Sequence, residues 1–276
     1  MSIKNAMSID LEDWFCVYVL SEAIQREDWD QCDLRVLQST KRILDLLDKH
    51  NTRATFFVLG YVAERLPELI RDIDARGHEI ATHGYNHHLI TRITPGEFEQ
   101  DLVRAIDVLK SSCGVQQDII GFRAPSFTIV EQTRWALDIL EQHNIRYDSS
   151  VFPIGFHPDY GMPDSPLAPY KITENLWEFP LSCVDILGRR LPCSGGGYFR
   201  LFPYRFTRYC INKCNRQGRP VVFYLHPWEL DPDQPRIDLP WDKKFRQYNN
   251  LHKTEKRLGA LLKHFEFTTL REVLGL

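Results

Sequence analysis

Residues 54–88 read ATFFVLGYVAERLPELIRDIDARGHEIATHGYNHH, and this stretch determines the fold class that we predict for the chain. Residues 54–59 form an apolar run of strand length, and residues 62–76 follow a helical pattern that ends at Gly77. Glycine favours a helix C-terminus because it adopts a left-handed conformation without a steric penalty. Residues 78–83 form a second strand, so the stretch predicts a strand–helix–strand unit followed by a polar HGYNHH segment.

The same alternation extends in both directions from this unit. Further strands are predicted at residues 6–9, 119–123, 147–149, 220–225 and 267–269, and further helices at 34–50, 94–112, 131–143, 204–216 and 249–264. The helix at 94–112 begins with a capping box, because Thr94 is a suitable N-cap, Pro95 follows it, and Glu97 can bond back to Thr94. Strands and helices that alternate at short spacing predict an α/β fold with a parallel sheet or barrel.

The composition is that of a globular protein with a substantial core, since 43% of the 276 residues are hydrophobic and 26% are charged. A net charge of −3 and a pI near 6.4 give no indication of a nucleic-acid partner or of binding to an anionic membrane. The apolar runs are far shorter than the roughly 20 residues of a membrane span, so we expect no transmembrane segment. The first residues contain no apolar signal core, which favours a cytoplasmic location.

Seven cysteines are present, at positions 16, 32, 113, 183, 193, 210 and 214. Only Cys210 and Cys214 are close in sequence, and their spacing differs from the CxxC of zinc ribbons and redox motifs. We therefore expect reduced and mostly buried thiols, which agrees with a cytoplasmic location.

Residues 152–203 interrupt the alternation with many prolines and with three consecutive glycines at 195–197. A plain loop of this length is uncommon in a compact domain, so we expect the segment to have structure of its own and to cover a site. We predict one domain over residues 1–276. It would consist of a barrel at about 1–230, which includes the covering segment, and a C-terminal extension at about 231–276 packed on it.

Polar residues follow five of the predicted strands. These segments are DLED at 10–13, HGYNHH at 83–88, RAPSF at 123–127, DSS at 148–150 and HPWE at 226–229. In α/β barrels the carboxyl ends of the strands meet at one face and carry the catalytic groups. We therefore expect the five segments to converge on one site.

His83 and His87 are four residues apart and can point in one direction from a helical turn, whereas His88 is a weaker candidate. With one carboxylate they would form a facial His-His-carboxylate set, which leaves coordination positions open for water and substrate. HxxxH pairs also occur on protein surfaces, so the interpretation depends on the nearby carboxylates and on the position after a strand. In that context the pattern predicts a divalent-metal site.

Asp10, Glu12 and Asp13 are more carboxylates than a structural turn needs. We expect one to bind the metal and another to act as a general base, because clustered negative charges raise one pKa while a cation keeps its ligand ionised. Asp10 and Glu12 share a face if the strand continues through Glu12, whereas Asp13 reaches the metal if the chain bends after Leu11. Both arrangements are compatible with the sequence.

Arg123, Asp148 and His226 are further polar residues at predicted strand ends. A guanidinium at the end of an apolar strand needs an acidic partner, and the carboxylate cluster can supply one to Arg123. His226 is expected at the same mouth and is a candidate for acid–base catalysis. Asp148 is a candidate for orienting His226 or Arg123.

In this order, the acidic segment, HGYNHH, RAPSF and the late LHP resemble the motifs of the polysaccharide deacetylase family, the carbohydrate esterases of family 4 that share the NodB homology domain. Three later stretches are similar to the exopolysaccharide-associated subgroup with a conserved C-terminal extension: GGGYFRLFP at 195–203, FYLHPWELDP at 223–232 and FRQYNNLHKTEKRL at 245–258. The resemblance covers almost the whole chain and implies a deformed (β/α) barrel, commonly of seven strands.

The resemblance also implies roles for single residues. His83 and His87 would take the two metal-histidine positions. Arg123 would hydrogen-bond the catalytic base, and His226 would be the general acid. The metal would be a divalent cation, with Zn²⁺ expected.

The acidic segment departs from the family pattern, which usually has two adjacent aspartates, base first and metal ligand second. This chain has DLED instead. One alignment makes Asp10 the base and Glu12 the ligand, and another makes Glu12 the base and Asp13 the ligand. We favour Asp10 as the base, with Glu12 and Asp13 as competing ligands.

The activity implied by the resemblance is hydrolysis of N-acetyl groups on amino sugars of an exopolysaccharide or its precursor, with release of acetate. The cation would lower the pKa of a bound water and polarise the acetamide carbonyl, and Asp10 would accept the proton of that water. A backbone N–H near Ser126 and Phe127 would stabilise the oxyanion. His226 would then protonate the leaving amine.

Several aromatic residues are candidates for stacking on sugar rings, and the resemblance implies a groove tryptophan at Trp177 or Trp228. We expect two or three of these residues at the site and the others in the core. The candidate substrate-binding residues are Tyr85, Pro125, Ser126, Phe127, Trp177, Tyr198 and Trp228.

Two other functions are compatible with these motifs. One is an allantoinase-like amidohydrolase that acts on a small linear or cyclic amide, and the other is an inactive carbohydrate-binding relative. Related barrels often form oligomers, so a homo-oligomer is expected by analogy alone.

Overall fold

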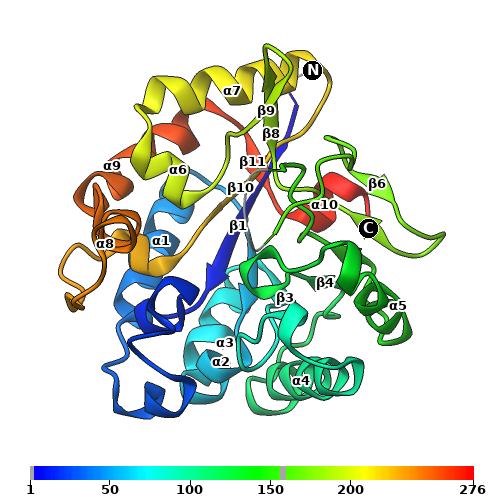
Figure 1. The fold of residues 1–276 in the computed structure, drawn as a ribbon, viewed down its shortest axis with the longest axis vertical. Coiled ribbons are helices and arrows are strands. Elements are labelled where there is room, and N and C mark those ends of the chain that lie inside the picture. The colour runs from blue at the N-terminus through cyan, green and yellow to red at the C-terminus, as the bar shows by residue number, and fades with distance from the viewer. Residues whose placement is uncertain (1–2, 156–159) are drawn as a thin grey trace.

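The computed structural model describes residues 3–155 and 160–276, and its central element is a nine-stranded sheet curled into a half-barrel (Figure 1). Its parallel strands follow the order β10 (Val222–Leu225), β1 (Asn5–Leu11), β2 (Thr55–Val58), β3 (Glu79–Thr82), β4 (Gly121–Phe122), β5 (Tyr147–Asp148) and β7 (Trp177–Glu178). β6 (Tyr170–Lys171) pairs antiparallel with β7, and β11 (Phe267–Thr268) pairs with the beginning of β1. The predicted α/β fold, a deformed (β/α) barrel, is confirmed in the form of a curled, mostly parallel sheet that makes a half-barrel. The sheet has nine strands rather than seven because β6 and β11 extend the parallel set.

Helices surround the sheet on the outside (Figure 1). The first half of the chain contributes α1 (Val36–Lys49), α2 (Gly60–Arg65), α3 (Pro67–Ala75), α4 (Pro95–Asp107) and α5 (Trp135–Gln142). The second half contributes α6 (Gly196–Leu201), α7 (Tyr204–Arg216), α8 (Trp241–Tyr248), α9 (Leu251–His264) and α10 (Leu270–Leu274). β8 (Cys183–Ile186) and β9 (Arg189–Pro192) form a separate hairpin, so the segment 152–203 contains regular elements of its own.

Strand β1 is buried along its whole length, as expected for a central parallel strand. Its alternate residues have different environments because successive side chains of a strand point to opposite faces. Met7, Ile9 and Leu11 pack in the main apolar cluster, whereas Ser8 and Asp10 contact the guanidinium of Arg123. One face of β1 thus builds the core, and the other begins the polar site.

The helix predicted at 62–76 is two helices, α2 and α3. Pro67 begins α3, and the preceding residue Leu66 adopts φ −130° and ψ 54°, outside the helical region. Proline lacks an N–H and restricts the residue before it, so the helical hydrogen bonds cannot continue through this point. The predicted capping box of α4 is present: Thr94 Oγ1 accepts from the N–H of Glu97, and the Glu97 side chain accepts from the N–H of Thr94.

All seven cysteines are unpaired, and all except Cys32 are buried. Within the described parts of the chain, no helix is both long enough and apolar enough to cross a membrane.

Candidate active site

The carboxyl end of β1 brings two acids to one place. Asp10 is buried, and its Oδ1 lies 2.6 Å from Arg123 Nη1. Ser8 Oγ lies 2.8 Å from the same nitrogen. Glu12 follows the last residue of the strand and lines the same cavity as Asp10. The chain therefore places Asp10 and Glu12 together, although β1 ends at Leu11 and the N–H of Glu12 turns back to the carbonyl oxygen of Asp10 at 3.0 Å.

His83 follows β3, and its ring is held by the backbone of the neighbouring strand. Its Nδ1 lies 2.7 Å from the carbonyl oxygen of Arg123. When Nδ1 donates this hydrogen bond, Nε2 keeps its lone pair and can bind a metal, an arrangement typical of metal-binding histidines. Burial lowers the pKa of His83 to about 4, so its ring is neutral at physiological pH and available as a ligand.

His87 completes a cluster with His83 and Glu12, and one ligand atom from each of the three residues lies within 4.8 Å of the others. His87 has a φ of 58°, in the left-handed region that residues with a Cβ rarely occupy. Its Nε2 lies 2.8 Å from Glu12 Oε2. The uncommon backbone conformation thus coincides with a ring placed against the carboxylate, as is typical of strained residues at functional sites.

These three residues fit a divalent cation. Burial alone would raise the pKa of Glu12, but the neighbouring imidazoles of His87, His226 and His83 lower it to about 2. Glu12 Oε2 is also buried without an aligned hydrogen-bond donor among the described residues. An ionised carboxylate oxygen that faces two imidazoles in this way is a donor set suited to zinc or a similar metal.

Asp13, the competing ligand, is not part of the cluster. Its Oδ1 accepts from the N–H of Trp14 at 2.8 Å, and its Oδ2 accepts from the N–H groups of Arg35 and Val36 at 2.7 and 2.9 Å. Val36 is the first residue of α1, so Asp13 satisfies the free N–H groups at that helix start. The alternative in which Asp13 is the metal ligand and Glu12 the base therefore disagrees with the geometry.

His226 follows β10, the strand beside β1, and lies against both acids. Its Nε2 is 3.7 Å from Asp10 Oδ2 and 3.6 Å from Glu12 Oε1. Its Nδ1 is 3.0 Å from Glu229 Oε2. Burial lowers the pKa of His226, but the hydrogen bond to Glu229 and the charges of Glu12, Glu229 and Asp10 outweigh burial and raise it to about 9. This imidazole is therefore protonated and directed into the site.

Glu229, not Asp148, orients His226, and the sequence analysis missed it. Glu229 Oε1 accepts from Nε of the buried Arg200 at 2.8 Å. The available signal was the HPWE segment, because a glutamate three residues after a histidine can reach back across one turn and accept a hydrogen bond from it.

Asp148 has a different place from the one predicted. Within the described residues it hydrogen-bonds neither His226 nor Arg123. Its partners are Ser150, whose hydroxyl donates to Oδ1, and the carboxyl group of Glu178. Ser150 Oγ in turn accepts from the N–H of Ala124 at 2.7 Å. Asp148 therefore supports the strand end that leads into the 123–127 segment.

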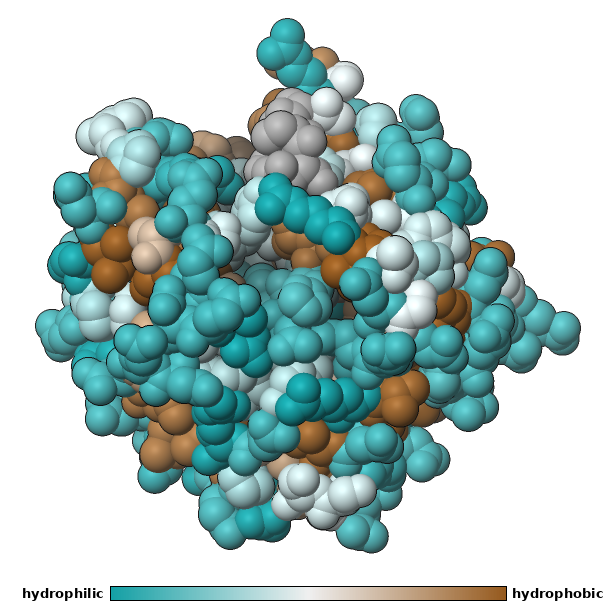
Figure 2. All heavy atoms as spheres, turned by 60° about the horizontal axis from the view of Figure 1, so that its bottom comes forward, coloured by the Kyte–Doolittle hydropathy of each residue, from teal (hydrophilic) through white to brown (hydrophobic). Residues whose placement is uncertain are grey.

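A cavity of about 350 Å³ opens beside the cluster, and a second of about 460 Å³ adjoins it. The first is lined by Asp10, Glu12, His83, His87, Ser126, Phe127 and His226. Both are lined by Val17, Val19, Phe127, Tyr160, His226 and Arg246, so they form one groove. Figure 2 shows a largely hydrophilic face that is hollowed near its centre, with hydrophobic residues in separate patches.

The groove separates the predicted substrate-binding residues into two sets. Those that line it are Ser126, Phe127, Tyr198 and Trp228. Trp228 also stacks on His226, with ring centroids 5.3 Å apart.

Tyr85, Pro125 and Trp177 do not line the groove. The buried Tyr85 has its hydroxyl 2.6 Å from Glu64 Oε2. Trp177 belongs to β7 and packs beneath Lys171. Phe127 N–H donates to the carbonyl of Ala124 at 3.0 Å, which makes Ser126 N–H the better candidate to bind an oxyanion.

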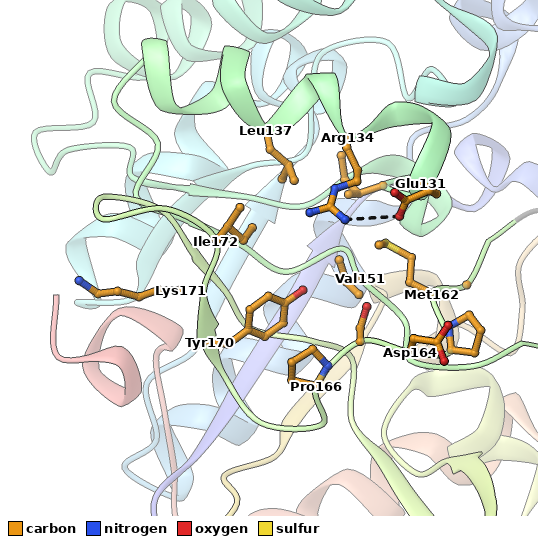
Figure 3. Close-up of a pocket in the computed structure, with 14 residues that line it drawn as sticks. Glu131, Arg134, Leu137, Val151, Met162, Asp164, Pro166, Tyr170, Lys171 and Ile172 are labelled. Atoms are coloured by element: carbon orange, nitrogen blue, oxygen red, sulfur yellow. Dashed lines mark hydrogen bonds and ion pairs between the residues drawn. The ribbon is translucent and has the colours of Figure 1, made fainter.

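Another cavity, of about 590 Å³, lies beside α5 and contains no comparable chemistry (Figure 3). Its charged residues include Arg134 and Glu131, which pair at 3.4 Å. Among the lining residues that the structure describes, none is a histidine or a cysteine. Two further cavities, of about 790 and 860 Å³, are also larger than either cavity of the groove, so size does not locate the site, whereas the titratable cluster does.

Comparison with known proteins divides the chain into two segments. Residues 29–148 match the family model for polysaccharide deacetylases, and residues 149–275 match a domain of unknown function, DUF3473. A peptidoglycan-N-acetylglucosamine deacetylase of Bacillus cereus is 34% identical over 103 residues, which are 37% of this chain and 37% of the relative. A chitooligosaccharide deacetylase of a Bradyrhizobium species is 39% identical over 74 residues, which are 27% and 34% of the two chains. The matches thus span about a third of these relatives.

Solved structures resemble this chain over nearly its full length. A Mycobacterium smegmatis protein described as a polysaccharide deacetylase has a TM-score of 0.66 at 21% identity, covering 99% of this chain and 89% of that one. The allantoinase PuuE has a TM-score of 0.63 at 16% identity, covering 98% and 88%. A CE4-family pseudoenzyme of Bacillus anthracis has a TM-score of 0.50 at 12% identity, covering 99% and 66%. These likenesses show a shared fold.

Proposed function

We propose that this chain, whose residues 29–148 belong to the polysaccharide deacetylase family, is a metal-dependent hydrolase that removes N-acetyl groups from amino sugars of a polysaccharide. The proposal extends to an exopolysaccharide or its precursor, because the stretches at 195–203, 223–232 and 245–258 resemble that subgroup. One observation carries it. The Glu12–His83–His87 cluster, the Arg123-bound Asp10 and the Glu229-bound His226 all lie in one groove.

Glu12, His83 and His87 would hold the cation, which Zn²⁺ suits. When bound, such an ion lowers the pKa of a coordinated water and polarises the acetamide carbonyl of the substrate.

Asp10 is placed to act as the general base. Arg123 occupies Oδ1, which leaves Oδ2 at the groove to accept a proton from the attacking water. Arg123 is itself fixed by Ser8 Oγ and by the carbonyl and hydroxyl of Ser149, so the direction of the carboxylate is set before substrate arrives.

His226 is placed to act as the general acid. Glu229 holds Nδ1 and presents Nε2 to the groove, and the raised pKa keeps the ring protonated. The imidazolium can donate its Nε2 proton to the leaving amine as the C–N bond breaks. The N–H of Ser126 would receive the developing oxyanion.

The experiment compares His83→Ala with His143→Ala, a control histidine that pairs with Glu99 away from the groove. Wild type should retain roughly one divalent ion per chain and release acetate from N-acetylglucosamine oligomers. His83→Ala should lose the ion and at least roughly 100-fold of the activity, whereas His143→Ala should keep both. Elemental analysis and an acetate assay measure these quantities. Full activity in His83→Ala would remove the metal hypothesis.

The same assay separates the two alternatives. Hydrolysis of a small ureide without acetate release would favour an allantoinase-like amidohydrolase, whose fold this chain shares. Sugar binding without hydrolysis of either substrate would favour an inactive relative. The clustered metal ligands favour the deacetylase over both.

A further inference from the structure

Helix α8 forms one rim of the groove, although it lies outside the segment that matches the deacetylase family. Asp242, Lys243 and Arg246 line the cavity beside the metal ligands, and Phe245 and Arg246 line the adjoining cavity. Lys243 Nζ contacts Glu22 Oε2, on another part of the rim, at 2.6 Å.

The buried Arg200 anchors the end of this helix. Its guanidinium donates to the carbonyl oxygens of Arg246, Gln247 and Asn249 at 2.9, 3.2 and 2.9 Å. The same guanidinium binds Glu229, which orients His226. One side chain therefore fixes the position of α8 relative to the catalytic histidine.

Two aromatic rings on α8 are exposed at this rim. Trp241 is 78% exposed and Phe245 is 43% exposed, which is unusual for side chains of this size. They are one helical turn apart, and their rings stack with centroids 5.8 Å apart and planes 21° apart. Together they form an exposed apolar surface, which we call the platform, next to the cavity lined by Phe245.

We propose that Trp241 and Phe245 form a saccharide-stacking platform that binds a sugar unit of the polymer away from the unit being deacetylated. The inference rests on the proposed function and adds a second contact with the same substrate. Pyranose rings have an apolar C–H face, which matches an exposed aromatic plane, and polar edges that need hydrogen-bond partners. The exposed Arg246, between the platform and the metal ligands, supplies five N–H donors for hydroxyl or carboxylate groups of the sugar.

Other occupants fit the platform less well. An anionic membrane would need a basic cluster, but Lys243 pairs with Glu22, and Lys244 pairs with Asp238 at 3.3 Å. A second copy of the chain would need about 800 Å² of contact on each partner, far more than two aromatic rings provide. A sugar ring has the size and the chemistry of the exposed surface.

The test measures kcat/KM for acetate release from an N-acetylglucosamine dimer and pentamer. In Trp241→Ala, the ratio of the pentamer value to the dimer value should fall roughly 5- to 10-fold, through KM rather than kcat, because only the longer chain reaches the platform. Trp241→Phe should restore most of the ratio. The control is Tyr209→Ala, which removes a 53% exposed aromatic from α7 that lines neither cavity of the groove.

The possible results distinguish a failure of the platform proposal from a failure of the proposed function. An unchanged ratio in Trp241→Ala, in an enzyme that deacetylates both substrates, would overturn the platform alone. If wild type releases no acetate, the proposed function fails, and calorimetric titration of wild type and Trp241→Ala with the pentamer then tests whether the platform binds sugar. Weaker binding by the variant would support the platform, and equal binding would overturn it. A wild-type dimer that dissociates in Trp241→Ala on ultracentrifugation would also overturn it, because a second copy would then cover the rings.

Discussion

Two buried arginines hold one carboxylate each beside His226, one pair from each half of the chain. Arg123 binds Asp10 at 2.6 Å, and Arg200 binds Glu229 at 2.8 Å. All four side chains are at most 3% exposed. Residue type, distance and burial are therefore nearly the same in the two pairs.

The pairs differ in what the second carboxylate oxygen does. Within the described residues, the one ion-pair contact seen for Asp10 Oδ2 is with His226 Nε2 at 3.7 Å, and Asp10 lines the groove. Glu229 Oε2 accepts from the backbone N–H and lies against the Nδ1 of His226, both at 3.0 Å, so neither of its oxygens is free. Asp10 can therefore accept a proton from water, whereas Glu229 can only position a neighbour. The role of each carboxylate thus depends on whether one of its oxygens is still free to accept a proton, and not on its pairing with an arginine.

The strongest test of this difference is Asp10→Asn. An amide at this position can keep a hydrogen bond to Arg123 but cannot accept the proton of water, so kcat should fall by roughly 10²–10⁴. The metal content should stay at the wild-type level, because Asp10 is outside the ligand cluster. Single-turnover rates and elemental analysis measure both. If Glu12→Gln alone abolishes turnover with the metal retained, while Asp10→Asn remains active, the base is Glu12.

A smaller effect is expected from Glu229→Gln, which removes the negative charge and leaves one acceptor oxygen, enough for His226 or for Arg200 but not for both. We expect kcat to fall roughly 10- to 100-fold, as for other residues that position a catalytic group. Because the charge of Glu229 raises the pKa of His226, its loss should lower that pKa. The alkaline limb of the kcat profile should therefore move to lower pH. A loss of rate with no movement of this limb would indicate a purely structural role.

The smallest effect, on the stability of the fold, is expected at a third pair of buried side chains. Asp148 and Glu178 are two carboxyl groups in contact with each other. Burial raises the pKa of Asp148 from 3.8 to about 6, and it also raises the pKa of Glu178 well above its usual value. The folded chain then binds more protons than the unfolded chain, so the pair stabilises the fold below pH 4 and loses this contribution as pH rises through 6.

Glu178→Gln replaces one of these acids by a neutral group. The free energy of unfolding of the variant minus that of wild type should increase by roughly 1 kcal/mol or more from pH 5 to pH 8. Urea unfolding of both proteins at the two pH values measures this change. Glu174→Gln, on an exposed glutamate of the same segment, should show no such pH dependence. A difference between Glu178→Gln and wild type that stays constant with pH would mean that the two acids do not share a proton.

The first half of the site was predictable from sequence because its ligands directly follow short apolar strands. His83, Arg123 and the acids after β1 each mark a strand end, and parallel strands bring such ends together. The choice between Glu12 and Asp13 was not predictable, because it depends on the backbone after Leu11 and on the N–H groups of residues 35 and 36 that Asp13 satisfies. Local spacing carries no information about partners supplied by another element.

The second half was harder to predict for the same physical reason. Arg200 and Glu229 are 29 residues apart and meet only because α6 packs against the turn after β10. That packing needs Gly196, where a Cβ would lie 1.6 Å from Glu229 Oε2. The partner of Asp148 is Glu178, which belongs to a two-residue strand without an apolar run. Helix α8 has eight residues and mostly polar side chains, so its pattern is too short to stand out from the Pro-rich chain before it.

The pairing of strand β1 limits where this chain can be divided into separate proteins. It pairs with β10 along one edge and, along the opposite edge, with β11 at its beginning and with β2 further on, and both β10 and β11 come from the last quarter of the chain. The boundary between the two family matches falls at the end of β5, inside the same sheet. A gene cut at this boundary would encode a first half with an unprotected sheet edge and without His226. The two segments should therefore be expressed and engineered as one chain.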